Sequence, residues 1–320
     1  MKNEAPLHGE AALYGLALAA YGIILLAPAA AEAALMRGLW RPFDIASYYG
    51  LAAPASSSIY AMVDAATAPP LFPFDMGAAS GYRIYVVSFF CIVTAMLVMD
   101  AGHKIYGGEA GLLAGLLFSL SITGAQGYLT AGEALALALV LFSAHALLFH
   151  ERYLLAGLCA GAAAGFKPLA LLLAPAALFY MYKKGEPRGA VAFAGAALLA
   201  LVLMALLAFA AYGSNAPAAA AGSGFTVAGF VADGEYRPQD ALMAAANLVL
   251  AACLFASLLP LALLGYSRDR GPAEDYLLAA GLCFAATIVL KQYLHYWPFA
   301  VPFLALLCSR AFRRRPSRVE

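Results

Sequence analysis

The topology of this chain depends on residues 153–182, which read YLLAGLCAGAAAGFKPLALLLAPAALFYMY. The stretch is apolar apart from Lys167, and it is too long for one straight crossing of a bilayer, which takes about 20 residues. Pro168 disfavours a helical conformation in the residue before it and ends most helices there. We therefore expect two short helices that meet at Lys167, each about 20 Å long, so that their turn lies within the membrane.

The rest of the chain is also apolar. Hydrophobic residues make up 64% of the 320 positions and charged residues 12%, which excludes a soluble domain of ordinary composition. Apolar runs near the length of a membrane span predict helices, because a helix satisfies its own backbone in hydrocarbon. These runs are 11–31, 84–99, 110–131, 134–148, 189–212, 241–266, 276–290 and 296–308. With the hairpin, they predict an all-α, polytopic protein of about ten transmembrane segments, forming one domain over residues 1–320.

The basic residues indicate the orientation of this domain. An even number of segments places both termini on one side, and with that side cytoplasmic, thirteen of the nineteen Lys and Arg residues fall inside. Short loops rich in Lys and Arg stay in the cytoplasm. A single crossing at 153–182 would move Lys183, Lys184 and Arg188 outside, so the distribution favours the hairpin. We expect a multi-pass protein of the cell membrane with cytoplasmic termini and two long outer loops, 32–83 and 213–240.

The first outer loop contains a candidate general base. Asp44, Ser47 and Tyr48 lie near one another at helical spacing. A carboxylate at this place could accept a proton from a substrate hydroxyl, or it could cap a surface helix. Tyr60 and the proline-rich stretch 68–75 follow, and this rigid path predicts either one wall of a cleft or an inert loop.

Lys167 is the most informative single residue. It is the only charge between Arg152 and Lys183, and it lies where the helix breaks. An ionisable group at membrane depth is a functional candidate, although a lysine can also extend its ammonium to the membrane surface. Because Lys167 is needed neither to span nor to anchor, we expect it to have an anionic partner, for which a lipid phosphate is suitable.

Four further polar residues lie near the outer ends of spans or in outer loops. Lys291 and His295 are four residues apart and could donate to phosphate or sugar oxygens, or could anchor the turn together with its aromatic neighbours. Glu133 begins a span, where the helix dipole alone favours an acid, and Gln126 precedes it among glycines that would admit a ligand. Arg237 lies in the second outer loop, which could be a lid or a solvated loop.

Several classes of site are not expected. The chain has no Walker motif, no Rossmann glycine pattern after a strand and no zinc-protease motif, so ATP-driven chemistry within it is not predicted. The five cysteines lie inside apolar runs without paired spacing, which is typical of packing residues and predicts neither a metal nor a disulfide.

The order of features along the chain resembles the glycosyltransferase-C superfamily, and within it the polyprenol-phosphate-mannose-dependent mannosyltransferases. The resemblance rests on short motifs: FDIASYY at 43–49 with Tyr60, PPL at 69–71, GLLAGLL at 111–117, AGLCAG at 156–161 leading to Lys167-Pro168, and HYWP at 295–298. It implies a glycosyltransferase-C-like fold that takes sugar from a polyprenyl-phosphate donor on the non-cytoplasmic face. It also implies that Asp44 is the catalytic carboxylate of the first outer loop and that Lys167 contacts the donor phosphate. The chain departs from some relatives in lacking a paired acid in this loop and a soluble outer domain.

The chemistry of a polyprenyl-phosphate sugar fits these residues. Its phosphate leaves as a stable anion, so the reaction needs a base for the acceptor hydroxyl and cations for the phosphate, and a single base favours inversion. The expected roles are Asp44 as base, Lys167, Lys291, His295 and Arg237 for the donor phosphate, and Tyr48, Tyr60, Glu133 and Gln126 for the substrate. The expected partners are the donor, a lipid, glycan or protein acceptor and the membrane, with no nucleic acid. No cofactor is indicated, and a divalent metal ion stays open as an alternative. The alternatives are a transporter or flippase for an anionic lipid or solute, and a non-catalytic assembly subunit.

Overall fold

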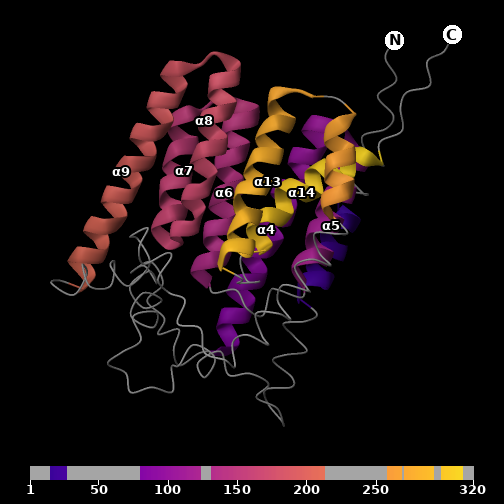
Figure 1. Ribbon diagram of the computed structural model, residues 1–320. Helices are drawn as coiled ribbons and strands as arrows, with labels where there is room; N and C mark the ends of the chain where they lie inside the picture. The colour runs from indigo at the N-terminus through magenta and orange to yellow at the C-terminus, as the bar shows by residue number, and fades with distance from the viewer. Residues whose placement is uncertain are drawn as a thin grey trace, which may run out of the picture.

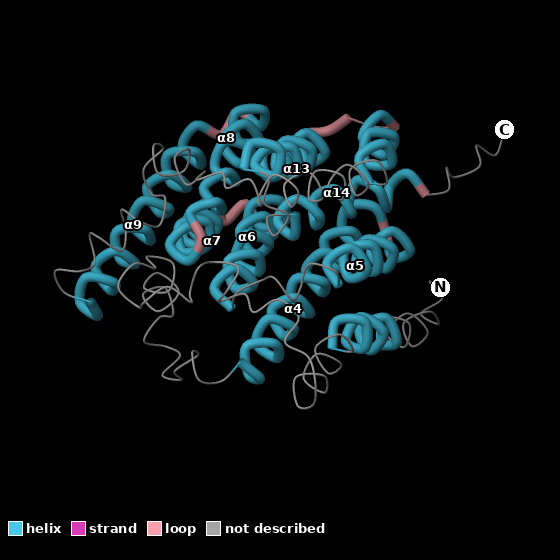
Figure 2. Tube along the Cα trace, turned by 60° about the horizontal axis from the view of Figure 1, so that its bottom comes forward, coloured by secondary structure: helices cyan, strands magenta, loops and turns pink. Residues whose placement is uncertain are grey.

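The computed structural model describes residues 15–26, 80–123, 131–212, 258–268, 270–291 and 297–312. The regular structure of this part of the chain is helical, as Figure 2 shows, which confirms the predicted all-α class there. The helices are α4 (Ser80–Tyr106), α5 (Gly108–Thr123), α6 (Ala131–His150), α7 (Tyr153–Phe166), a 3-10 helix (Pro168–Leu172), α8 (Leu173–Lys184), α9 (Pro187–Tyr212), α13 (Pro272–Lys291) and α14 (Trp297–Ala311). Two further apolar helices are Gly15–Leu26 and Leu258–Ser267.

The helices pack side by side as a bundle (Figure 1), and tight connections reverse the chain at one end of it. Gly107 joins α4 to α5, Glu151 and Arg152 join α6 to α7, and Gly185 and Glu186 join α8 to α9. Each connection contains a residue in the left-handed region, with φ of 100° at Gly107, 50° at Glu151 and 71° at Gly185. We call this end of the bundle the charged end, for the side chains described below, and the opposite end, which holds Lys167, the Lys167 end.

Residues 153–184 form the predicted pair of short helices. Helix α7 ends at Phe166, and Lys167 follows with an extended backbone (φ −144°, ψ 110°) before the 3-10 helix that Pro168 begins. The Lys184 Nζ lies 2.6 Å from the Glu151 Oε1, so the end of α8 returns to the end of the bundle at which α7 starts. The break at Lys167 and the return of the chain are therefore confirmed, and they follow from the proline.

Glycines bring α7 and α9 into backbone contact. Gly157, Gly161 and Gly165 repeat every four residues along α7, and a Cβ atom on Gly161 would overlap the carbonyl oxygen of Ala197 on α9. The same atom on Gly157 would overlap the carbonyl oxygen of Phe193. Because the contacts advance in the same order on both helices, α7 and α9 run parallel. Small residues at this spacing allow helices in a membrane to approach closely.

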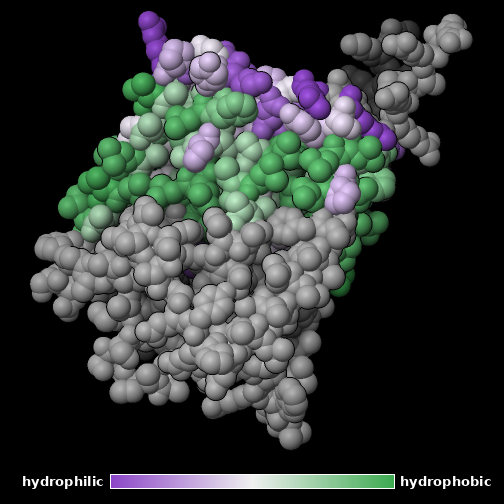
Figure 3. Space-filling view, viewed as in Figure 1, coloured by the Kyte–Doolittle hydropathy of each residue, from purple (hydrophilic) through white to green (hydrophobic). Residues whose placement is uncertain are grey.

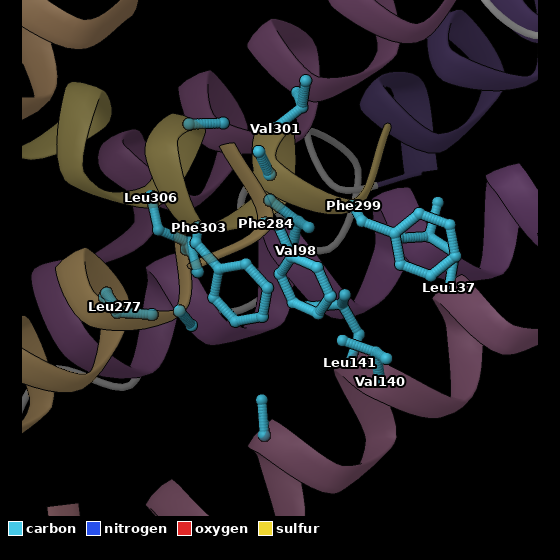
Figure 4. Close-up of a cluster of buried hydrophobic side chains, with 14 of the residues drawn as sticks. Val98, Leu137, Val140, Leu141, Leu277, Phe284, Phe299, Val301, Phe303 and Leu306 are labelled. Atoms are coloured by element: carbon cyan, nitrogen blue, oxygen red, sulfur yellow. The ribbon is translucent and has the colours of Figure 1, made fainter. Parts of the chain in front are cut away.

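Helix α14 lies in the interior of the bundle. All of its residues from Trp297 to Ala311 are buried, including Pro302, and it packs against α13, α5 and α4. Its Phe299 and Phe303 rings lie 5.6 and 5.9 Å from the ring of Phe284 on α13, in the cluster of Figure 4. Aromatic pairs at this separation add to the burial of apolar area, so this cluster fixes α13 against α14.

The outer surface of the helices is apolar. Three segments are long and apolar enough to cross a membrane, namely Val86–Tyr106, Gly132–His150 and Pro187–Leu206. On α9, Leu198 is 63% exposed and Leu206 is 58% exposed, and Figure 3 shows an apolar band next to the polar end of the helices. A soluble monomer rarely exposes an apolar surface of this extent. The protein is therefore a membrane-like helical protein.

Each predicted span coincides with a described helix, wholly or in part. Besides the three long segments, the apolar helices Gly15–Leu26, Gly108–Ile122, Tyr153–Phe166, Leu258–Ser267 and Trp297–Ala311 are shorter than a full crossing. At 1.5 Å per residue, a 15-residue helix such as α14 reaches about 22 Å, against about 30 Å of hydrocarbon. The number of crossings stays a prediction.

Candidate functional site

Lys167 and Glu133 form an ion pair, with 2.5 Å between Lys167 Nζ and Glu133 Oε1. Glu133 lies in the first turn of α6, and Lys167 follows the last residue of α7. A two-residue connection makes α6 and α7 antiparallel neighbours, and Ser143 Oγ on α6 donates to the Ala156 carbonyl on α7 at 2.7 Å. The first turn of α6 and the end of α7 therefore meet at the Lys167 end.

The pair is shielded from water. The Glu133 side chain is 5% exposed and the Lys167 side chain 20% exposed, and buried apolar residues flank both of them, among them Ala134 and Ala164. Removing a charge from water is costly unless another charge or several hydrogen bonds compensate it. The pairing and the positive dipole at the start of α6 both stabilise the Glu133 carboxylate. In this state the anion at Lys167 comes from the chain itself.

The sequence singled out Lys167 and Glu133 separately and did not predict that they pair. The anionic partner expected for Lys167 was a lipid phosphate, which stays a prediction, and in the structure the ammonium pairs with Glu133. A length argument could have found the pair. Glu133 precedes the α6–α7 connection by roughly the number of residues by which Lys167 follows it, so an antiparallel hairpin puts both at one level.

The other predicted site residues are not placed by the structure. Asp44, Tyr48, Tyr60, Gln126, Arg237 and His295 lie outside the described residues. Lys291 ends α13, and its side chain also lies outside the described set. Because α13 begins at the charged end, the backbone of Lys291 lies toward the Lys167 end.

At the charged end, an ion pair between α13 and α14 is buried. Arg310 Nη1 lies 2.5 Å from Glu274 Oε1, with side chains 8% and 12% exposed. The Arg310 guanidinium also lies 5.1 Å from the ring centroid of Tyr106, at the end of α4. One arginine therefore joins α14 to α13 and to α4.

A second set of contacts joins the adjoining helices of the charged end. Asp275 on α13 lies 3.2 Å from Lys183 on α8, and it accepts a hydrogen bond of 2.7 Å from the Tyr266 hydroxyl. This hydrogen bond, together with the Lys183 ammonium, holds the pKa of the Asp275 carboxyl below its ordinary value. The hydrogen bond to Glu151 raises the pKa of the Lys184 ammonium. The sequence analysis used Lys183 and Lys184 only to assign the cytoplasmic side, and the structure shows that they also form ion pairs.

A third charged cluster was missed by the sequence analysis. The Asp100 Oδ2 on α4 lies 2.7 Å from Lys104 Nζ and 3.2 Å from the His145 Nε2 on α6. The Lys104 ammonium also lies 5.2 Å from the ring centroid of Phe149. Ionisable residues inside apolar runs, such as His145, are the signal that could have identified it.

The search for a metal site and the comparison with known proteins add no residue to the candidate site. Over the described ranges, no group of three or more His, Cys, Asp or Glu side chains could hold a metal ion. In comparisons with known proteins, no family model, no curated protein and no solved structure matches this chain.

Proposed function

We propose that this chain is a multi-pass membrane glycosyltransferase. It moves a sugar, which the family resemblance suggests is mannose, from a polyprenyl-phosphate donor to a lipid, glycan or protein acceptor on the non-cytoplasmic face. The observation that supports this proposal best is the Lys167–Glu133 pair, a shielded ammonium at a helix break in an apolar protein. A cation in such surroundings suits the phosphate of a lipid-linked donor.

The proposed orientation places the Lys167 end on the non-cytoplasmic face, with about ten crossings and both termini cytoplasmic. It is supported by the basic residues near the connections of the charged end, since such residues mark cytoplasmic loops. These residues are Lys104, Arg152, Lys183, Lys184, Arg188, Arg268, Arg270 and Arg310.

An apolar surface beside Lys167 supports a lipid-linked substrate. Leu171, in the 3-10 helix that follows Lys167, is 41% exposed, and Leu158, more than two turns earlier along α7, is 38% exposed. A polyprenyl chain can lie against exposed leucines while its phosphate contacts the ammonium. A water-soluble sugar nucleotide would gain nothing from this surface.

In the proposed mechanism Asp44 accepts the proton of the acceptor hydroxyl, whose oxygen attacks the sugar carbon. The bond from that carbon to the phosphate oxygen breaks, and the polyprenyl phosphate leaves as an anion that Lys167 stabilises. One direct displacement inverts the configuration at the carbon. Lys291, His295 and Arg237 provide further donors to the phosphate, and Tyr48, Tyr60, Glu133 and Gln126 are the remaining proposed substrate contacts.

The experiment is to incubate the purified protein with radiolabelled polyprenyl-phosphate sugars and a membrane lipid extract. The proposal predicts transfer of label, its loss in Asp44→Asn with donor binding retained, and weaker donor binding in Lys167→Met. Lys183→Met, at the charged end, is the matched control and should behave as the wild type. No transfer from any polyprenyl-phosphate sugar, or near-normal turnover by Asp44→Asn, would contradict the proposal.

A flippase for an anionic lipid is the second candidate, because α6 carries Glu133 in its first turn and His145 near its other end. An anion that crosses beside α6 would meet ionisable groups at both ends, of which Glu133 is already paired with Lys167. Movement of a fluorescent polyprenyl phosphate across proteoliposomes, without transfer of sugar, would favour the flippase over the transferase.

A further inference from the structure

The Lys167 ammonium already has an anion, because Glu133 lies 2.5 Å from it. A lipid phosphate that binds to Lys167 therefore brings a second negative charge to one cation. Two anions close together in surroundings of low dielectric disfavour each other's charged form. The Glu133 side chain is only 5% exposed, so water cannot solvate the carboxylate in its present position. Neutralising one of the two negative charges relieves this repulsion.

The carboxylate is the group that can accept a proton. A phosphodiester stays anionic over the physiological range, whereas a carboxylate that loses its cation in a dry site becomes neutral by protonation. A neutral carboxyl group can also donate a hydrogen bond, for which a phosphate oxygen is a suitable acceptor.

We propose that Glu133 is an exchangeable counter-ion of Lys167: a lipid phosphodiester takes over the ammonium, and the Glu133 carboxylate takes up one proton from water. The inference rests on the proposed function, which assigns the donor phosphate to Lys167. The exchange keeps Lys167 neutralised in the absence of donor. It also discriminates against neutral lipids, because these cannot replace the carboxylate.

Most of the other described charged side chains lie at the charged end, away from this pair. At the charged end are Asp100, Lys104, His145 and His150 on α4 and α6, Lys183 and Lys184 on α8, Arg188 on α9, Glu274 and Asp275 on α13 and Arg310 on α14. Arg83 on α4 and Lys291 on α13 lie toward the Lys167 end, with side chains outside the described residues. The test therefore uses variants of Glu133 and Lys167 themselves, so that a pH effect is assigned to this pair.

The probe is geranylgeranyl methyl phosphate, a phosphodiester that keeps one negative charge between about pH 5 and pH 9, added to the protein in phosphatidylcholine nanodiscs. Calorimetry in buffers of different ionisation enthalpy gives the number of protons taken up with each probe molecule. The wild type should take up about one proton, and its affinity should fall by about tenfold per pH unit as the pH rises, because the complex binds a proton that the free protein lacks.

Glu133→Gln should bind the probe with no proton uptake, independently of pH, and more tightly than the wild type at alkaline pH. Lys167→Met should lose affinity for the probe at every pH. The matched control is Glu151→Gln, which removes the carboxylate paired with Lys184 at the charged end and should keep the proton uptake of the wild type. Geranylgeraniol, which has no phosphate, should bind more weakly than the probe and without proton uptake.

The outcomes separate this inference from the proposed function. Equal affinities of the wild type and Lys167→Met would remove the phosphate from Lys167 and overturn both. Binding that depends on Lys167, but without proton uptake by the wild type, would overturn the counter-ion exchange and leave the proposed function standing. Weaker binding by Glu133→Gln than by the wild type would also overturn it, since Glu133 would then orient Lys167. The wild-type measurement needs no variant to fold.

Discussion

At the charged end, acidic side chains meet partners from two or more helices, whereas at the Lys167 end a single lysine meets a glutamate beside a broken helix. Asp275 contacts Lys183 and Tyr266, and Arg310 contacts Glu274 and Tyr106. Loss of one contact at the charged end leaves others in place. The Lys167–Glu133 pair lies where the helix is interrupted and apolar surface is exposed. In our proposal, a lipid phosphate binds there and replaces the Glu133 carboxylate as the partner of Lys167.

The number of charged residues at an end of the bundle does not identify the proposed phosphate site. The charged end holds most of the described charged residues, yet its contacts join helices to one another. The Lys167 end, in its described part, holds few charges, and one of them is shielded by the fold. Both ends contain a shielded ion pair, but only the Lys167–Glu133 pair lies at a helix break, which makes it the stronger indication of function.

The two largest expected effects are of similar size, and the first comes from breaking the packing that positions α7 between the two ends. Gly161→Leu places a side chain where the Ala197 carbonyl already lies, so we expect a loss of about 3 kcal/mol of stability from overpacking. Thermal unfolding in detergent measures it. Gly195→Leu on α9 is the matched control, because no atom lies within 4 Å of an added Cβ there. Equal destabilisation by both variants would contradict the proposed backbone contact.

The second prediction tests whether the charged end is structural. Glu274→Gln leaves Arg310 buried without its carboxylate, and breaking a buried pair costs about 3–5 kcal/mol. The double variant Glu274→Gln with Arg310→Met should recover part of this loss, because no uncompensated charge remains. A double-mutant cycle of chemical unfolding measures the coupling. Strict additivity of the two single variants would show that the pair does not stabilise the charged end.

The third prediction concerns acid. The pKa of Asp275 is lowered in the folded protein, so its contacts contribute stability that is present above the unfolded-state pKa of about 3.9 and is lost as the pH falls through the folded-state value. The stability of Asp275→Asn should therefore fall less than that of the wild type as the pH is lowered through this range. Unfolding followed by circular dichroism across this range measures it. An unchanged acid dependence would contradict the assignment.

The smallest effect is expected for the exposed pair of the charged end. Glu151 is 59% and Lys184 31% exposed, so Glu151→Gln should cost about 0–1 kcal/mol, and salt should reduce the difference. Unfolding at low and high ionic strength measures it. A loss as large as that of Glu274→Gln would remove the distinction between buried and exposed pairs.

Local rules predicted the positions of the helices and the break at Lys167, because Pro168 and the length of apolar runs act over a few residues. The Lys167–Glu133 pair joins residues far apart in sequence, so it required the antiparallel packing of α6 and α7. Burial within the bundle could not be predicted either. Helix α14 is buried throughout and α9 is largely exposed, although both read as apolar runs. Lipid tails are as apolar as a protein core, so composition does not distinguish the two surroundings.

The predicted loop residues depend on a different kind of information. Asp44 and Arg237 lie in the two long outer loops expected from the sequence, and both its local spacing and the family resemblance singled out Asp44. Their positions relative to Lys167 carry the proposed chemistry, because one glycosyl phosphate has to contact the base and the cation together.

The most direct test is an electron cryomicroscopy structure of the protein in a nanodisc with a non-hydrolysable polyprenyl-phosphate sugar analogue. The account predicts a phosphate oxygen about 3 Å from the Lys167 Nζ, and the Asp44 carboxylate on the opposite side of the sugar carbon. A phosphate bound at the charged end, or Asp44 and Lys167 on separate flanks too far apart for one donor to reach both, would contradict it.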